Sequence, residues 1–261
     1  MVKFRPGLRI ISVNSNYCSR LNLWSLYDPV DPANQLSFLR DQLKEAEESG
    51  DYVHIIGHVP PNHRECTEAW LFNYIRLMER FGHLIRGQFF GHTHRDEFRV
   101  VFSTTNTSDP VAFQFISPAM TSYSGTNPSY RIYSVDPDTF EVLGHETYFF
   151  NLTECNAMPS HTNPCWKLEY NTRDTLKIYK INQHTLNGIL KKMHGLDEDG
   201  HPTEGDKEAF FKEYYRRYYV QSEAPVAKSF DIVKKNKILK AHSVSNPFTR
   251  SGSNSIIPSR R

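Results

Sequence analysis

Two histidine-containing loops hold the residues of this sequence best suited to chemistry. The tetrad Gly91-His92-Thr93-His94 carries two imidazoles, and Gly57-His58 supplies a third imidazole earlier in the chain. Imidazole nitrogens bind zinc and other borderline metals, and a tight loop can direct its two imidazoles at two neighbouring cations. Gly91, just before the pair, would let the backbone approach a bound metal closely. One such tetrad could be an ordinary surface loop, but the two motifs together, in this order, indicate a metal site.

The elements before these loops should place the histidines side by side. Apolar runs and amphipathic stretches alternate as strand, helix, strand, helix and strand, which is typical of an α/β fold. In such folds functional loops lie at the carboxyl ends of the strands, where both histidine motifs fall. The expected elements are strands over 8–14, 52–56 and 84–90, a helix from Asp31-Pro32 to Gly50, and a helix over 68–80.

The rest of the chain changes character twice. The pattern becomes rich in strands from Glu97 and helical after Cys165, and it is basic, Ser-rich and non-periodic over 226–261, which predicts a disordered tail. The late aromatic residues at helical spacing are expected to dock their helix on the core, with contact to lipid as the alternative. Outside the two motifs, nine further histidines need no chemical role, and His145 is expected to be structural. The expected elements are strands over 98–102, 111–117, 130–135 and 140–149, and helices near 174–193 and 203–219.

Composition excludes some functions and leaves the cellular compartment open. Net charge is +2, with 31 basic and 29 acidic residues, so nothing indicates a nucleic-acid partner. No run reaches the ~18–20 apolar residues of a membrane span. The first residues lack the apolar stretch of a signal peptide, which alone would suggest a cytosolic protein. Four cysteines without CxxC spacing permit three disulfide pairings, and the sequons at Asn106 and Asn151 could carry glycans. The cysteines and sequons together favour the secretory pathway and predict that the beginning of the protein is missing.

Several stretches match the pattern of one known family: residues 6–12, 16–20, 54–61, 88–98, 127–133, 145–148 and 151–153. Through them the sequence resembles the acid sphingomyelinases, within the calcineurin-like metallophosphoesterases, from about Pro6 to about Pro225. The resemblance implies the carboxy-terminal half of a metallophosphoesterase β-sandwich flanked by helices over 1–150. A helical carboxy-terminal region over 151–225 and the tail over 226–261 would follow.

The resemblance also implies a cofactor and roles for individual residues. Enzymes of this family use two zinc ions to polarise a phosphodiester and to activate the attacking water. By resemblance His58 and His92 are ligands of one zinc, and His94 is a ligand of the other. Tyr123 matches a tyrosine near the phosphate-binding cleft, and a packed aromatic residue is the alternative. The family also pairs Cys18 with Cys66, which leaves Cys155 and Cys165 as the second disulfide.

The sequence departs from the family in its metal ligands. The family pattern begins with Asp-x-His, Gly-Asp and Gly-Asn-His, and this chain contains none of the three in the required order. We therefore expect no catalytic residue here beyond the metal ligands, weak zinc binding, and no appreciable activity of the chain alone. Exposed apolar surface is expected where further chain would pack.

Three functions remain open from the sequence. The first is part of a secreted or lysosomal sphingomyelin phosphodiesterase, which cleaves sphingomyelin to ceramide and phosphocholine and touches the membrane surface transiently. The second is a related phosphodiesterase that acts on nucleotides or other soluble phosphate esters. The third is a non-enzymatic truncated product that binds lipid or another subunit.

Overall fold

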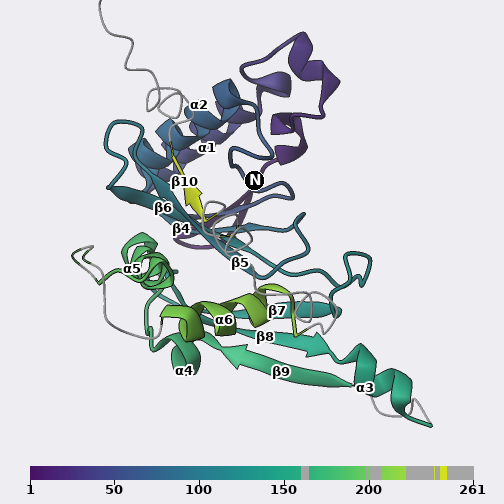
Figure 1. Cartoon of the computed structure of the whole chain (residues 1–261). Helices are drawn as coiled ribbons and strands as arrows, with labels where there is room; N and C mark the ends of the chain where they lie inside the picture. Colours follow the sequence, from purple (N-terminus) through teal and green to yellow (C-terminus); the bar gives the residue numbers. More distant parts are fainter. Residues whose placement is uncertain are drawn as a thin grey trace, which may run out of the picture.

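The computed structural model describes residues 1–159, 165–197, 199, 201, 207–221, 238 and 242–245. These residues form a mixed α/β structure with a seven-stranded sheet and a three-stranded sheet (Figure 1). The α/β prediction is confirmed at this level, while its assignment to half of a metallophosphoesterase sandwich stays a prediction. No described helix is long and apolar enough to cross a membrane.

The larger sheet brings the ends of its parallel strands to one edge. Strands β2, β3, β4 and β6 run parallel in that spatial order, and β5 is antiparallel to β6. All the strands expected up to residue 117 are present. The sequence patterns missed the two edge strands, β1 and β10. The bounds are β1 Val2–Arg5, β2 Leu8–Ser12, β3 Tyr52–Ile56, β4 Ile85–Phe90, β5 Glu97–Phe102, β6 Pro110–Ile116 and β10 Ser243–Val244.

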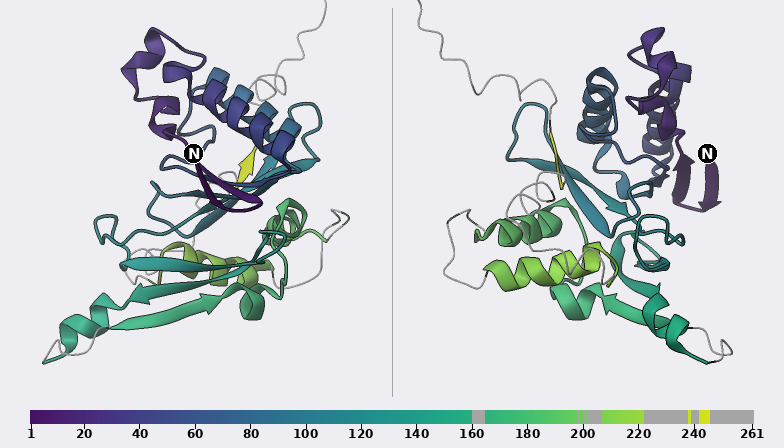
Figure 2. Two further views of the ribbon diagram at one scale, coloured as in Figure 1. Left: turned by 180° about the vertical axis from the view of Figure 1, so that it is seen from behind. Right: turned by 45° about the vertical axis from the view of Figure 1, so that its right-hand side comes forward.

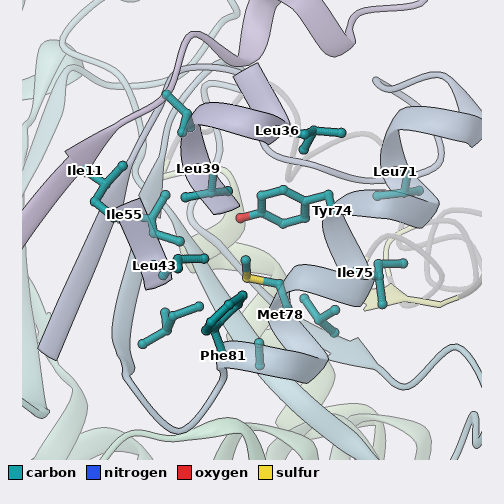
Figure 3. Packing of buried hydrophobic residues seen from close by; sticks show 14 of the residues in the cluster. Ile11, Leu36, Leu39, Leu43, Ile55, Leu71, Tyr74, Ile75, Met78 and Phe81 are labelled. Carbon is teal, nitrogen blue, oxygen red and sulfur yellow. The ribbon is translucent and has the colours of Figure 1, made fainter. Parts of the chain in front are cut away.

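Helices α1 (Gln35–Ser49) and α2 (Glu68–Phe81) cover one face of this sheet (Figure 1). The predicted apolar stripe of α1 is buried, and in Figure 3 it faces Tyr74 and Met78 of α2 across the core. The predicted start of this helix at Asp31-Pro32 is too early, because a 3-10 turn over Pro32–Asn34 comes first and α1 begins after Asn34. The Asp31 carboxylate nevertheless accepts the backbone N–H groups of Leu36 at 2.7 Å and Ser37 at 2.9 Å, at the start of α1. The stripe comprises Leu36, Leu39, Leu43 and Ala46.

The opposite face of the sheet packs against the second half of the chain (Figure 2). Phenylalanines of β5 and β6 meet the apolar faces of α5 and α6, and Phe115 and Phe89 contact Tyr133 of β7. Phe211 and Tyr214 are buried in this cluster, which confirms that the aromatic helix docks on the core. The bounds are β7 Ser129–Val135, β8 Val142–Phe150, α3 Leu152–Ala157, β9 Trp166–Asn171, α4 Thr172–Leu176, α5 Gln183–His194 and α6 Lys207–Tyr218.

Two predictions for the region after Cys165 are wrong. Residues 166–171 form strand β9 instead of a helix, because they pair antiparallel with β8, a partner that local pattern does not reveal. The helix expected over 174–193 is interrupted after Leu176. Lys177 has a φ of 56°, and α5 begins afresh where Asn182 and Thr185 form a reciprocal capping box.

The predicted disordered tail over 226–261 lies mostly outside the described residues. Its described residues contradict the prediction, since Ser243 and Val244 pair parallel with β5 and Ile238, His242 and Val244 are buried. The physical reason is that β5 would otherwise present an open sheet edge above an apolar core.

An exposed apolar segment follows β2. Its large side chains are each at least 71% exposed, while the expectation that further chain packs on such a surface stays a prediction. The residues are Leu21, Leu23, Trp24, Leu26 and Tyr27.

Candidate metal centre

The two histidine loops meet at the carboxyl edge of the large sheet. His58 follows β3 and His92 follows β4, and these strands are hydrogen-bonded neighbours. The Gly91 N–H donates to the His58 carbonyl oxygen at 3.0 Å, which ties one loop to the other. The rings of His58 and His92 lie with their centroids 5.3 Å apart and their planes at 82°. The structure thus brings together the residues that the resemblance assigns to one cation.

The tetrad has an unusual backbone. His92 has a φ of 74° and His94 a φ of 57°, both in the left-handed region that side chains other than glycine seldom adopt. Such conformations cost about 1–3 kcal/mol each and persist where surrounding contacts hold them, often at functional sites. The resulting loop carries two imidazoles, of His92 and His94, just past the end of one strand.

The two glycines differ in what they allow. A Cβ on Gly57 would lie 2.9 Å from the Phe90 ring and 3.1 Å from the Ser15 hydroxyl, so packing of the protein itself requires glycine there. At Gly91 a Cβ would meet only the His58 ring, at 3.9 Å. Space is therefore open beside Gly91, on the side where a close approach to a metal was expected.

Ser15 holds the backbone of His58, and a cavity lies beside this histidine. The buried Ser15 hydroxyl accepts the N–H groups of His58 at 3.1 Å and Val59 at 2.8 Å. Burial, followed by the nearby His92 and His94, lowers the pKa of His58 and favours its neutral, metal-binding form. An open cavity of about 650 Å³ adjoins His58 at the ends of β2 and β3. Nothing in the sequence pattern singled out Ser15.

Each histidine of the tetrad has one nitrogen already engaged. Nε2 of His92 lies 3.1 Å from Oε2 of Glu65, and Nδ1 of His94 lies 2.7 Å from Oγ of Ser124. Among the described residues, nothing hydrogen-bonds to Nδ1 of His92 or Nε2 of His94. These two nitrogens are therefore available for metal ligation. Sequence reasoning missed both Glu65 and Ser124.

The donor set fits the implied metal in chemical type. The described residues include one group of carboxylate and imidazole ligand atoms that all lie within 4.8 Å of one another, made by Asp197, Asp199 and His201. Among the described residues, the three predicted histidines form no such tight group. Their role as ligands stays a prediction.

Tyr123 lies beside this loop. Its side chain is 90% exposed, so the alternative of a packed aromatic residue is wrong. The next residue, Ser124, holds His94, and Arg95 donates to the Ser124 carbonyl oxygen at 3.3 Å. The predicted contact between Tyr123 and phosphate stays a prediction.

Both predicted disulfides are present. Cys18–Cys66 joins the loop after β2 to the loop after His58, and Cys155–Cys165 closes the connection from α3 to β9.

Of the two sequons, Asn106 is exposed in the turn between β5 and β6. Asn151 caps α3, with its side-chain oxygen accepting the Glu154 N–H at 3.1 Å. Glycosylation of either residue stays a prediction. His145 is buried against Phe115 and Tyr133, which agrees with a structural role.

Comparison with known proteins decides the family. The model of the acid sphingomyelin phosphodiesterase C-terminal region matches residues 109–231. The chain is 49% identical over 175 residues to sphingomyelin phosphodiesterase of Bos taurus, which covers 66% of this chain and 27% of that protein. It is 43% identical over 194 residues to sphingomyelin phosphodiesterase of Homo sapiens, covering 73% and 30%. The chain belongs to the acid sphingomyelinase family.

A nucleotide-directed relative also matches this acid sphingomyelinase-like chain. It is 31% identical over 238 residues to the cyclic GMP-AMP phosphodiesterase SMPDL3A of Homo sapiens, covering 86% of this chain and 49% of that protein. The chain spans about a quarter to a third of the length of the two sphingomyelin phosphodiesterases. The match to the family model covers the second half of the chain, beyond His58, His92 and His94.

Proposed function

We propose that this acid sphingomyelinase-like chain supplies metal ligands to a zinc-dependent phosphodiesterase that hydrolyses sphingomyelin to ceramide and phosphocholine. The observation that carries the proposal is the meeting of His58 with the strained loop of His92 and His94. Each imidazole of that loop keeps one nitrogen without a hydrogen bond to any residue that the structure describes. The higher identity to two sphingomyelin phosphodiesterases supports the choice of substrate.

The residues of the chain would divide the work as follows. His58 and His92 would hold one zinc and His94 the other, and the bound metals would polarise the phosphodiester and activate a water. Ser124 fixes the His94 ring through its hydrogen bond. The exposed Tyr123 hydroxyl, next in sequence to Ser124, donates to a phosphoryl oxygen and stabilises its developing charge.

A two-metal centre needs more ligands than these three imidazoles, and the family's other ligand motifs do not occur in the required order in this chain. We expect zinc to bind weakly to this chain alone and turnover to be negligible without further ligands. The two disulfides support a secreted or lysosomal site of action, and the exposed apolar segment over 21–27 supports transient contact with the membrane surface.

A chimaera provides the test. The 175 matched residues of the Bos taurus enzyme are replaced by those of this chain, and hydrolysis of sphingomyelin is measured in mildly acidic buffer with zinc. Turnover that is lost in the His92→Ala chimaera would support the proposal. A folded chimaera whose turnover is unchanged by His92→Ala would refute the assigned ligand.

The second candidate, hydrolysis of a nucleotide phosphodiester, is favoured by the longer match to the cyclic GMP-AMP phosphodiesterase. The matching chimaera with that enzyme is assayed on cyclic GMP-AMP and on sphingomyelin. Turnover of the dinucleotide by both chimaeras would change the proposed substrate to a nucleotide. Turnover of sphingomyelin by the first chimaera alone would keep sphingomyelin as the proposed substrate.

A further inference from the structure

Glu65 stands beside the candidate metal centre without any assigned role. Its Oε2 lies 3.1 Å from Nε2 of His92, and the two side chains are 28% and 38% exposed. Both groups are thus partly withdrawn from water, unlike a fully solvated surface pair.

The backbone around Glu65 is held in place from two sides. The Arg20 N–H donates to the Glu65 carbonyl oxygen at 2.8 Å, and the next residue, Cys66, is covalently joined to Cys18. The Cys66 N–H also donates to the Asn62 carbonyl oxygen at 3.0 Å. The carboxylate is therefore presented to His92 by a cross-linked loop instead of by a free chain.

The chemistry of imidazole gives this contact a consequence. A neutral imidazole carries a proton on one nitrogen and a lone pair on the other, and the partner of the protonated nitrogen decides which is which. A carboxylate can only accept, so Nε2 of His92 donates and Nδ1 keeps the lone pair. Carboxylate partners of metal-binding histidines commonly fix ring orientation and raise ligand basicity in this way.

We propose that Glu65 is a positioning residue of the metal centre, which accepts the Nε2–H of His92 and presents Nδ1 of that ring to the cation. The inference rests on the proposed metal binding by His92. It assigns to the loop between β3 and α2 a part in ligation that no histidine motif reveals.

The test is a double-mutant cycle read out by metal binding. Binding of zinc, and of cobalt(II) through its absorption spectrum, is titrated on the oxidised full chain. The variants are Glu65→Ala, Glu65→Gln, His92→Ala and the double variant Glu65→Ala/His92→Ala. Glu68→Ala is the matched control, since Glu68 is an exposed carboxylate of the same loop–helix region. Thermal unfolding of each variant checks that it is folded.

The expected result is that Glu65→Ala weakens binding about 10–100-fold, with partial rescue in Glu65→Gln, which keeps an acceptor oxygen. Glu68→Ala binds as the parent chain does. The double variant binds no more weakly than His92→Ala, because Glu65 acts through that ring.

Other outcomes separate the two proposals. If His92→Ala leaves binding unchanged, the proposed metal site itself is refuted, and the role of Glu65 with it. If His92→Ala weakens binding and Glu65→Ala does not, the metal site stands and the positioning role is refuted. A further loss on adding Glu65→Ala to the His92→Ala background would make Glu65 a direct ligand and overturn the positioning role.

Discussion

Removal of the Cys18–Cys66 disulfide should cost both stability and metal binding. The two cysteines are separated by 48 positions in the sequence, whereas Cys155 and Cys165 are separated by 10. In the chain-entropy treatment, closing loops of these sizes lowers the entropy of the unfolded chain by an amount worth about 4 kcal/mol and about 2.7 kcal/mol respectively. Replacing both cysteines of a pair by alanine should therefore lower the free energy of unfolding more for the first pair than for the second.

The metal readout distinguishes the two disulfides more sharply. Cys66 follows Glu65, and Ser19 forms an isolated β-bridge with Cys66, so the first disulfide fixes the loop that carries the carboxylate. The second closes a loop between α3 and β9. Loss of the first pair should weaken zinc binding severalfold, and loss of the second should not.

The assay is urea unfolding of the oxidised chain and its two double-alanine variants, followed by zinc titration under native conditions. Equal stability losses would show that entropy of loop closure does not dominate. Unchanged zinc binding in Cys18→Ala/Cys66→Ala would refute the argument that this cross-link positions the site.

Three further predictions concern packing, capping and pH. Gly57→Ala should lower the free energy of unfolding in urea by about 1–3 kcal/mol, because the added Cβ would clash with the Phe90 ring, whereas Gly91→Ala should be nearly neutral. Equal effects of the two substitutions would contradict this packing argument. Asp31→Ala should cost about 0.5–2 kcal/mol, since two N–H groups at the start of α1 lose their acceptor; an unchanged unfolding midpoint would exclude the cap. Burial lowers the pKa of His242 to about 4, so the unfolded chain takes up its proton first, near pH 6.5. The free energy of unfolding should therefore fall by about 3 kcal/mol as the pH is lowered from 6.5 to 4, and by less in His242→Gln. The same pH dependence in that variant would rule out His242 as the source.

The periodic spacing of apolar residues predicted those helices and strands whose pattern is visible within a short stretch of sequence. The apolar stripe of α1 and the glycine-histidine ends of β3 and β4 depend on neighbours in sequence, and these predictions hold. Strand β9 and strand β10 depend instead on partners in β8 and β5, which no local period reveals. Buried ion pairs are equally invisible to local pattern. Asp96, just before β5, pairs with Arg131 of β7 at 2.5 Å and accepts a hydrogen bond from the Tyr170 hydroxyl of β9 at 2.9 Å, and these contacts join it to the second sheet.

The candidate ligands were visible in the sequence, whereas the residues that contact them were not. Histidines at strand ends are visible as a motif, because residue type and position both point to metal chemistry. Ser15, Glu65 and Ser124 are ordinary polar residues in sequence, and only folding brings them against His58, His92 and His94. The one sequence signal near them was the cysteine pair, which ties the loop of Ser15 to the loop of Glu65.

These supports bear on how the site would take up metal. The left-handed backbone of His92 and His94 is unfavourable on its own, and here contacts within the protein hold it. Gly91 donates to the His58 carbonyl, Thr93 donates to the Gly91 carbonyl, and Arg95 donates to the Thr93 hydroxyl. With the rings further held by Glu65 and Ser124, the ordering cost is met during folding instead of during binding. A few imidazoles fixed in this way should bind zinc more tightly than the same residues on a mobile loop. The proposed metal centre would then depend on the cross-link at Cys66 as well as on its ligands.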